Sequence, residues 1–132
     1  MARIIIRDGT EPNEGNCLSF DLAEILTALG PRAITSSWAY RDLEFVSRSE
    51  QEGPQLEQDL EATLPLSGKD LLRATDRILQ VIDGEFAAFD QEKQTPWVIV
   101  RAVDSSWWEV ESTDESVLAA VGVCFRSVKY GA

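Results

Sequence analysis

The sequence predicts a single α+β domain over residues 1–132, with a mainly antiparallel sheet of about five strands and three or four helices. Runs of β-branched and aromatic residues, typical of strands, alternate with segments whose apolar residues recur at helical spacing. Short polar turns separate the later strands, and such turns join antiparallel neighbours. A length of 132 residues suits one domain and requires no metal or disulfide for folding.

The first third of the chain predicts a strand, a helix and a second strand. Residues 3–7 contain a compact β-branched run. A helix is expected over 19–29, where Leu and Ile recur at helical spacing until Gly30 and Pro31 end it. Residues 34–46 carry β-branched and aromatic side chains with partial alternation, which indicates a strand.

The middle of the chain predicts two helices of different strength. The acidic segment 47–66 is expected to be a loop that includes a short helix, because its leucines recur every four residues. A firmer helix is expected to begin at Ser67, whose hydroxyl can cap it, and to continue to Ile82 before Gly84. Residues 85–89 fit a strand better than a last helical turn.

The C-terminal part predicts a β-meander followed by a final amphipathic helix docked on the sheet. Segments 97–103 and 107–111 are rich in apolar residues and are separated by a short polar turn. Ser112 and Glu115 have the spacing of a capping box. Apolar residues across 117–128 then fall on one helical stripe, so this helix is expected to end the fold.

The composition excludes several classes of function. The chain has 12 Lys and Arg against 23 Asp and Glu, a net charge of −11, which disfavours nucleic acid as a partner. It has no histidine, which excludes catalytic triads and metal sites built on imidazole. No motif for a phosphate group, a metal or a cofactor accompanies the carboxylates, so neither a cofactor nor a metal is predicted.

The cysteines and the hydropathy pattern predict a cytoplasmic protein. Cys17 and Cys124 share no motif and are expected to be free thiols in or near the core. The N-terminal apolar run has three residues, and the longest apolar stretch, 119–125, has seven. Both are too short for a signal peptide or a membrane span, so no membrane partner is expected.

Tryptophans are the first candidate binding residues. Trp107 and Trp108 are adjacent, so on a strand they point to opposite faces of the sheet, and Trp97 begins the preceding strand. One ring of the pair can enter the core. The other is either covered by the 47–66 segment or exposed as a recognition surface.

Carboxylates near the C-terminal turn are the second candidates. Glu109 and Glu111 lie two residues apart and share one face of a strand, with Asp104 at the turn nearby. Such a group can support acid–base chemistry if burial separates the pKa values of its members. A solvated sheet face explains the same pattern without any chemistry.

The acidic middle of the chain is the third candidate. Glu57, Asp59 and Glu61 lie within 44–64, a stretch whose only basic residue is Arg48. A surface of one sign accelerates association with an oppositely charged partner. The alternative is again a solvated surface.

Two hypotheses about function follow from these patterns. The preferred one is a non-catalytic, acidic protein–protein interaction module, in one version an inhibitor or immunity-type protein that covers the active site of a basic partner such as a nuclease. The alternative is a small-ligand binder or a histidine-free enzyme that uses carboxylates, with Asp104 and Glu109 as its pair. The first is preferred because no nucleophile or oxyanion donor accompanies those carboxylates.

Overall fold

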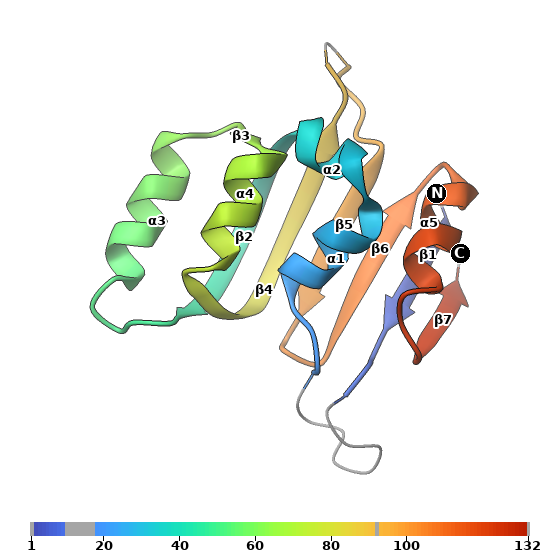
Figure 1. Cartoon of the computed structure of the whole chain (residues 1–132), viewed down its shortest axis with the longest axis horizontal. Coiled ribbons are helices and arrows are strands. Elements are labelled where there is room, and N and C mark those ends of the chain that lie inside the picture. The colour runs from blue at the N-terminus through green and yellow to red at the C-terminus, as the bar shows by residue number, and fades with distance from the viewer. Residues whose placement is uncertain (1, 10–17, 92, 132) are drawn as a thin grey trace.

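Residues 2–9, 18–91 and 93–131 are described by the computed structural model, and in these ranges seven strands form one antiparallel sheet accompanied by five helices (Figure 1). The strands are β1 (Ala2–Ile6), β2 (Ser37–Ser47), β3 (Leu66–Ser67), β4 (Ile78–Phe89), β5 (Val98–Val103), β6 (Trp107–Ser112) and β7 (Val128–Gly131). The helices are α1 (Leu22–Leu29), α2 (Pro31–Thr35), α3 (Gly53–Ala62), α4 (Gly68–Thr75) and α5 (Glu115–Gly122). Across the sheet the order is β3-β2-β4-β5-β6-β1-β7. The predicted α+β class with antiparallel strands is confirmed.

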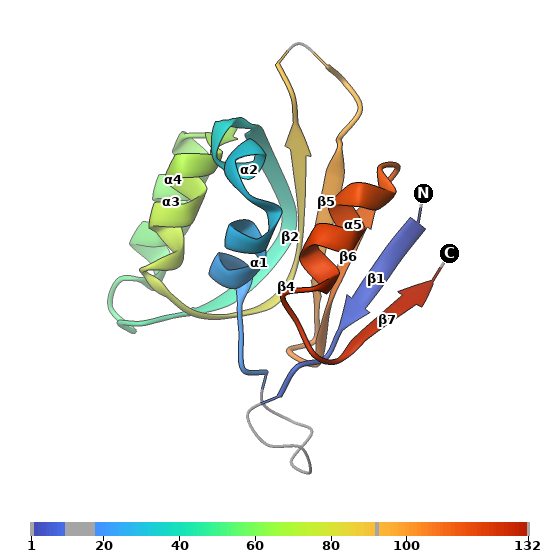
Figure 2. The ribbon, with the colours of Figure 1, turned by 45° about the vertical axis from the view of Figure 1, so that its right-hand side comes forward.

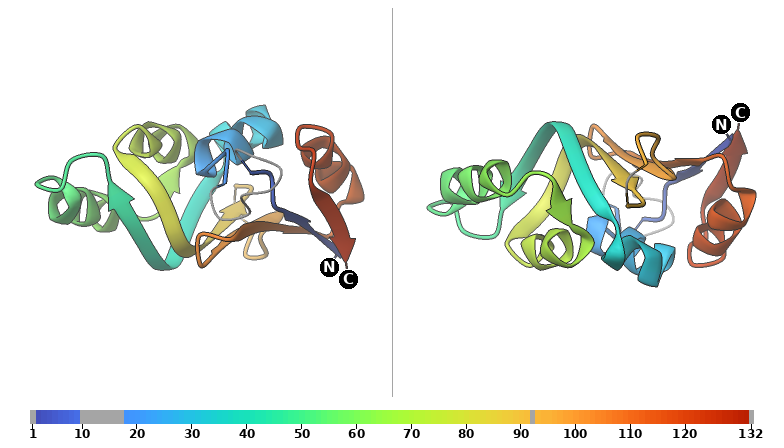
Figure 3. Two further views of the ribbon diagram at one scale, coloured as in Figure 1. Left: turned by 90° about the horizontal axis from the view of Figure 1, so that it is seen from below. Right: turned by 90° about the horizontal axis from the view of Figure 1, so that it is seen from above.

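The helices form one layer on one face of the sheet. The views along the vertical axis show α4, α1, α2 and α5 on the same side, with α3 beside α4 at the edge made by β2 and β3 (Figure 3). Figure 2 shows α5 in front of β6, with β1 beside it. The opposite face of the sheet carries no helix within the described ranges, and we call it the open face.

The core lies between the helical layer and the sheet. Along β5 and β6, buried and partly exposed residues alternate strictly, so each strand turns one set of side chains toward the helices. Phe86, Val100 and Val110 stand side by side across β4, β5 and β6, and each is at most 1% exposed. Leu26 of α1 and Leu118 of α5 belong to the same buried cluster. The open face carries the alternate, partly exposed residues, which are charged ones such as Arg101 and Glu109 beside apolar ones such as Ile99.

The expected number of about five strands is wrong because two short strands, β3 and β7, were not foreseen. In addition, the helix that was expected to continue to Ile82 ends at Thr75, and β4 begins earlier than the expected strand at 85. Ser67 does cap this helix, since its hydroxyl accepts the backbone N–H of Asp70 at 3.0 Å. β4 follows almost at once and includes the 85–89 segment, as predicted. In the first part of β4 the buried residues Ile78, Val81 and Gly84 are three apart, a spacing that also fits a helix, and the pairing of this segment with β2 makes it a strand.

The prediction that a docked helix ends the fold is also wrong. α5 stops at Gly122, and the chain returns as β7 to pair with β1. Glycine is a weak helix former, so the helix does not continue along the apolar stripe. The turn after α5 is held by the buried Asp8 carboxylate, which accepts the backbone N–H groups of Arg126 and Ser127 at 2.9 and 2.5 Å. Val128, expected on the helix, is therefore a strand residue.

The start of α5 differs from the expected capping box. Asp114 caps the helix, its carboxylate accepting the backbone N–H of Ser116 at 2.9 Å. Ser112 is instead buried at the end of β6, where its hydroxyl donates to the carbonyl oxygen of Trp97 at 2.6 Å. Ser112 therefore links the end of β6 to Trp97, just before β5, and is not the N-cap of α5.

Two smaller expectations concern the cysteines and the membrane. Cys124, expected near the core, is an exposed free thiol in the turn after α5, and Cys17 lies outside the described residues. Among the helices of the described chain, none combines the length and the hydropathy that crossing a membrane requires.

Candidate functional site

Two of the three candidate tryptophans are core residues. Trp108 is fully buried, and its ring is stacked with that of Phe86 at 6.4 Å between centroids. Trp97 is 7% exposed, and its indole N–H donates to the Ser36 hydroxyl at 2.9 Å. The guanidinium of Arg32 covers the Trp97 ring at 4.2 Å from its centroid. These contacts leave little of either ring for a partner.

Trp107 points the other way, onto the open face. Its ring is partly exposed, its indole N–H donates to Glu109 at 3.0 Å, and the Arg7 guanidinium lies over it at 5.1 Å. The 47–66 segment does not cover this ring, because α3 lies on the helical side of the sheet (Figure 3). Trp107 is thus an amphipathic ring held between a cation and an anion.

Ion pairs link the strands across the open face. The Glu85 carboxylate of β4 pairs with Arg41 of β2 and accepts a hydrogen bond from Arg101 of β5 at 2.7 Å. Arg101 also donates to Glu111 of β6 at 3.2 Å. Partial burial opposes the ionisation of Glu85, but hydrogen bonds from Arg41 and Arg101 hold its pKa below the ordinary value. The predicted candidate Glu111 therefore ends a charge network that crosses β2, β4, β5 and β6.

Glu109, the other candidate on this face, is also paired with an arginine. Its carboxylate accepts a hydrogen bond from Arg3 of β1 at 3.2 Å in addition to the bond from Trp107. Asp104 lies at the exposed β5–β6 turn, where its own backbone N–H donates to Asp83 at 2.8 Å. Within the described ranges, no group of His, Cys, Asp and Glu side chains is arranged to hold a metal ion. The Asp104 and Glu109 pair of the alternative hypothesis thus has one member already neutralised by an arginine.

The acids of α3 divide between its two flanks. Leu56 and Leu60 are buried beneath the helix, and Asp59 lies on one side of this apolar stripe while Glu57 and Glu61 lie on the other. Asp59 accepts hydrogen bonds from Gln55 at 2.9 Å and from Arg77 at 3.0 Å, and these bonds lower its pKa.

Glu57 and Glu61 are exposed and four residues apart. In the part of the chain that the structure describes, no Lys or Arg lies within ion-pair distance of either. Both carboxylates interact electrostatically with Tyr40 of β2. Burial is the main cause that raises the Tyr40 pKa, and the negative charges of Glu61 and Glu57 raise it further. This flank of α3 therefore lies toward β2.

The outer edge of β2 is open over most of its length. β3 pairs with β2 only at Ser37 and Trp38, so within the described ranges Ala39–Ser47 has no strand on that side. The strand is irregular there, with Asp42 at a φ of 55° and a register shift between Arg41 and Glu44. Bulges and charges of this kind are common protection for a strand edge that remains in water.

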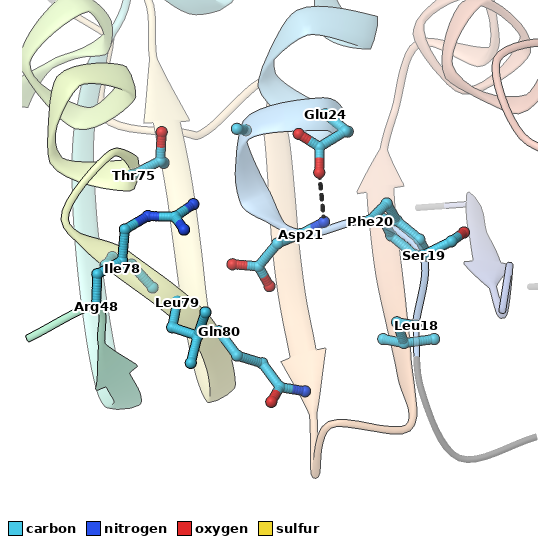
Figure 4. Close-up of a pocket in the computed structure, with 11 residues that line it drawn as sticks. Leu18, Ser19, Phe20, Asp21, Glu24, Arg48, Thr75, Ile78, Leu79 and Gln80 are labelled. Carbon is cyan, nitrogen blue, oxygen red and sulfur yellow. Dashed lines mark hydrogen bonds between the residues drawn. The ribbon is translucent and has the colours of Figure 1, made fainter. Parts of the chain in front are cut away.

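A pocket on the helical side was not foreseen from the sequence. It encloses about 390 Å³ between the start of α1, the end of β2, and the junction of α4 and β4 (Figure 4). Asp21, immediately before α1, is partly buried at its wall. Burial raises the pKa of Asp21 to about 6, against the lowering effect of backbone hydrogen bonds from Val81 and Leu22. Perturbed carboxylates in a pocket are frequent at binding sites.

The sequence contains a local signal for one wall of this pocket, the start of α1. Asp21 and Glu24 have the spacing of a capping box, and the Glu24 carboxylate accepts the Asp21 N–H at 2.8 Å. The N-cap of α1 is therefore Asp21, whereas the helix was expected to begin two residues earlier, at Ser19. Nothing local indicates that Arg48 and Gln80 join the same pocket, because they come from distant segments.

Comparison with protein-family models, with curated proteins and with solved structures finds no match for this chain.

Proposed function

We propose that this protein is a non-catalytic interaction module that binds a basic protein partner through α3 and the adjacent free edge of β2. The observation that carries the proposal is the pair Glu57 and Glu61, two exposed carboxylates on one helix flank without a cation in the described chain. Like charges four residues apart destabilise a helix by roughly 0.2–0.5 kcal/mol. A Lys or Arg of a partner would remove this repulsion.

The surrounding surface supports the same choice. Exposed acids that form no ion pair within the described ranges gather from the β2 bulge to the end of α3, and they are Asp42, Glu44, Glu50, Glu52, Glu57 and Glu61. Unpaired charges of one sign produce a field that attracts a basic protein over the Debye length. The carboxylates of the open face contribute less to such a field because arginines neutralise them.

The β2 edge gives the module a second means of contact. The bulge at Asp42 protects this edge from non-specific pairing, but a partner whose basic side chains face α3 can place an extended segment beside the edge and form main-chain hydrogen bonds. An inhibitor or immunity-type protein that covers a basic active site is one form of this proposal. The exposed thiol of Cys124 is compatible with a reducing compartment, and we place the interaction in the cytoplasm.

Affinity capture followed by kinetics tests the proposal. The wild-type chain, the variant E57K/E61K and the control D76K/E115K are used as baits in a lysate of the source organism; both variants change the net charge equally, at exposed residues. We expect a basic protein that is retained by the wild type and the control and lost by E57K/E61K. With that protein purified, the association rate constant should fall at least ten-fold for E57K/E61K, with a weaker salt dependence.

Two results would contradict the proposal. One is a captured partner whose association rate constant changes equally in E57K/E61K and in the control. The other is a set of captured proteins that is the same for all three baits, because α3 would then have no part in recognition.

A further inference from the structure

Arg48 differs from the other arginines of the protein. Each of the others, all within the described ranges, pairs with a carboxylate or covers an aromatic ring. Arg48 has no such partner in those ranges, although acids outnumber bases about two to one in the chain. It is exposed and lies at the pocket beside Asp21.

Asp21 is the counterpart of Arg48 within this pocket. Its carboxylate accepts the backbone N–H of Val81 at 3.2 and 3.3 Å, and no Lys or Arg of the described chain lies within ion-pair distance. Figure 4 shows the Arg48 guanidinium and the Asp21 carboxylate directed toward each other from the two sides of the pocket. An anion and a cation thus line one cavity without forming an ion pair.

The remaining walls supply an apolar surface. Phe20 and Ile78 are buried at the wall, Leu79 is 57% exposed, and Gln80 adds a neutral polar group. A cavity of about 390 Å³ lies within the range of small-ligand sites. Two opposite charges beside an apolar wall match a ligand that carries both charges and an apolar side chain.

We infer that this pocket binds a small zwitterion of the α-amino acid class, with its carboxylate on Arg48, its ammonium on Asp21 and its apolar side chain against Phe20 and Leu79. A guanidinium binds a carboxylate with two parallel hydrogen bonds. A partly buried carboxylate gains most from a cation that is itself brought out of water. This inference is independent of the proposed interaction through α3.

The charged neighbours of Asp21 set the direction of the pH dependence. Glu24 of α1 raises the Asp21 pKa and Arg48 lowers it, while α4 and β4 face the pocket with the neutral residues Thr75 and Gln80. With a pKa of about 6, Asp21 is ionised at pH 8 and about nine-tenths protonated at pH 5. Ligand affinity should therefore be about ten-fold weaker at pH 5 than at pH 8.

An NMR titration of the ¹⁵N-labelled full chain tests the inference with L-leucine as the probe. N-acetyl-leucine lacks the ammonium and leucinamide lacks the carboxylate, so the three compounds separate the two charged contacts. At pH 8 we expect saturable shifts of the Val81 and Leu22 amide signals with L-leucine, and binding at least ten-fold weaker for both analogues. The wild-type result does not depend on any variant folding.

Variants assign the contacts to residues. Asp21→Asn keeps a residue that is favourable before a helix, and Arg48→Gln removes only an exposed charge. Each should weaken L-leucine binding at least ten-fold, whereas Arg73→Gln on the exposed side of α4 should leave it unchanged. The inference is overturned if L-leucine produces no saturable shifts, if either analogue binds as well as leucine, or if Asp21→Asn binds as the wild type does.

Discussion

The open face of the sheet and the flank of α3 that carries Glu57 and Glu61 both contain acidic residues, yet their charges are organised in opposite ways. On the open face, Glu85, Glu109 and Glu111 all meet arginines that come from other strands. On α3, Glu57 and Glu61 meet no arginine or lysine within the described ranges. The first arrangement stabilises the protein's own strands, and the second leaves charge for another molecule.

The net charge of −11 therefore does not indicate which carboxylates are free to meet a basic partner. A strand places its side chains opposite those of neighbours, so a sheet can neutralise acids with bases from distant parts of the chain. A helix at the sheet edge has neighbours on fewer sides: Asp59 of α3 meets Arg77 on the side toward α4, whereas Glu57 and Glu61 on the other flank meet no base within the described ranges. Four measurements test whether the two regions differ in this way.

The first prediction compares the losses of stability for Trp108 and Trp107, which lie on opposite faces of β6. Trp108→Ala should lower the free energy of unfolding by about 3–5 kcal/mol, because it opens a cavity beside Phe86 in a filled core. Trp107→Ala should cost about 1 kcal/mol or less, since only an exposed cation–π contact and one hydrogen bond are lost. Guanidinium unfolding followed by circular dichroism measures both. Equal losses would mean that the open face is packed as a core, and the comparison would fail.

Sequence reasoning anticipated the opposite orientations of these two rings, because a period of two is a local property of a strand. It also anticipated the α+β class, the 85–89 strand and the Ser67 cap, which again depend on neighbouring residues. The extent of α4 and α5 was missed because apolar residues continue at helical spacing beyond the ends of both helices, and tertiary pairing with β2 and β1 turns those continuations into strands.

The candidate sites show the same limit. Glu109 and Glu111 were correctly placed on one strand face, but their partners Arg3 and Arg101 are fixed by strand order, which the sequence does not display. The pocket of Asp21 was missed for the same reason, since its walls come from separate segments. Acidic residues can be located from the sequence, whereas their neutralisation depends on the three-dimensional structure.

The second prediction concerns Asp21, a partly buried carboxylate that forms no ion pair within the described ranges. Its folded pKa of about 6 lies above the unfolded value, so the folded state binds the proton more tightly, and stability should fall as the pH rises from about 4 to 6. Asp21→Asn should remove this decrease and raise the free energy of unfolding by about 1–3 kcal/mol at pH 7.5, with little change at pH 4. Urea unfolding across this pH range provides the measurement. If the difference in the free energy of unfolding between variant and wild type were the same at pH 4 and at pH 7.5, the pKa of Asp21 would not be raised by folding.

The third prediction concerns the open-face network. Glu85→Gln should lower the free energy of unfolding at pH 7 by about 0.5–1 kcal/mol, a modest value because solvent screens the pairs with Arg41 and Arg101. The pKa of Glu85 is depressed in the folded state, so its stabilisation is present above the unfolded pKa and disappears as the pH falls through the folded pKa. Wild type and variant should therefore converge in acid. A difference that persists at pH 2 would assign the loss to packing instead of charge.

The fourth prediction has a small expected effect and tests the contrast between α3 and the open face most directly. Glu57→Gln and Glu61→Gln together should leave stability unchanged or raise it by roughly 0.2–0.5 kcal/mol, because the change removes repulsion at i and i+4 without breaking an ion pair. The matched control is Asp59→Asn on the other flank, which breaks a contact with Arg77 and should not stabilise the protein. Thermal and urea unfolding at low ionic strength, where the repulsion is least screened, make the difference measurable. If the double variant were clearly destabilised, Glu57 and Glu61 would be structural residues of the fold, and α3 would resemble the open face.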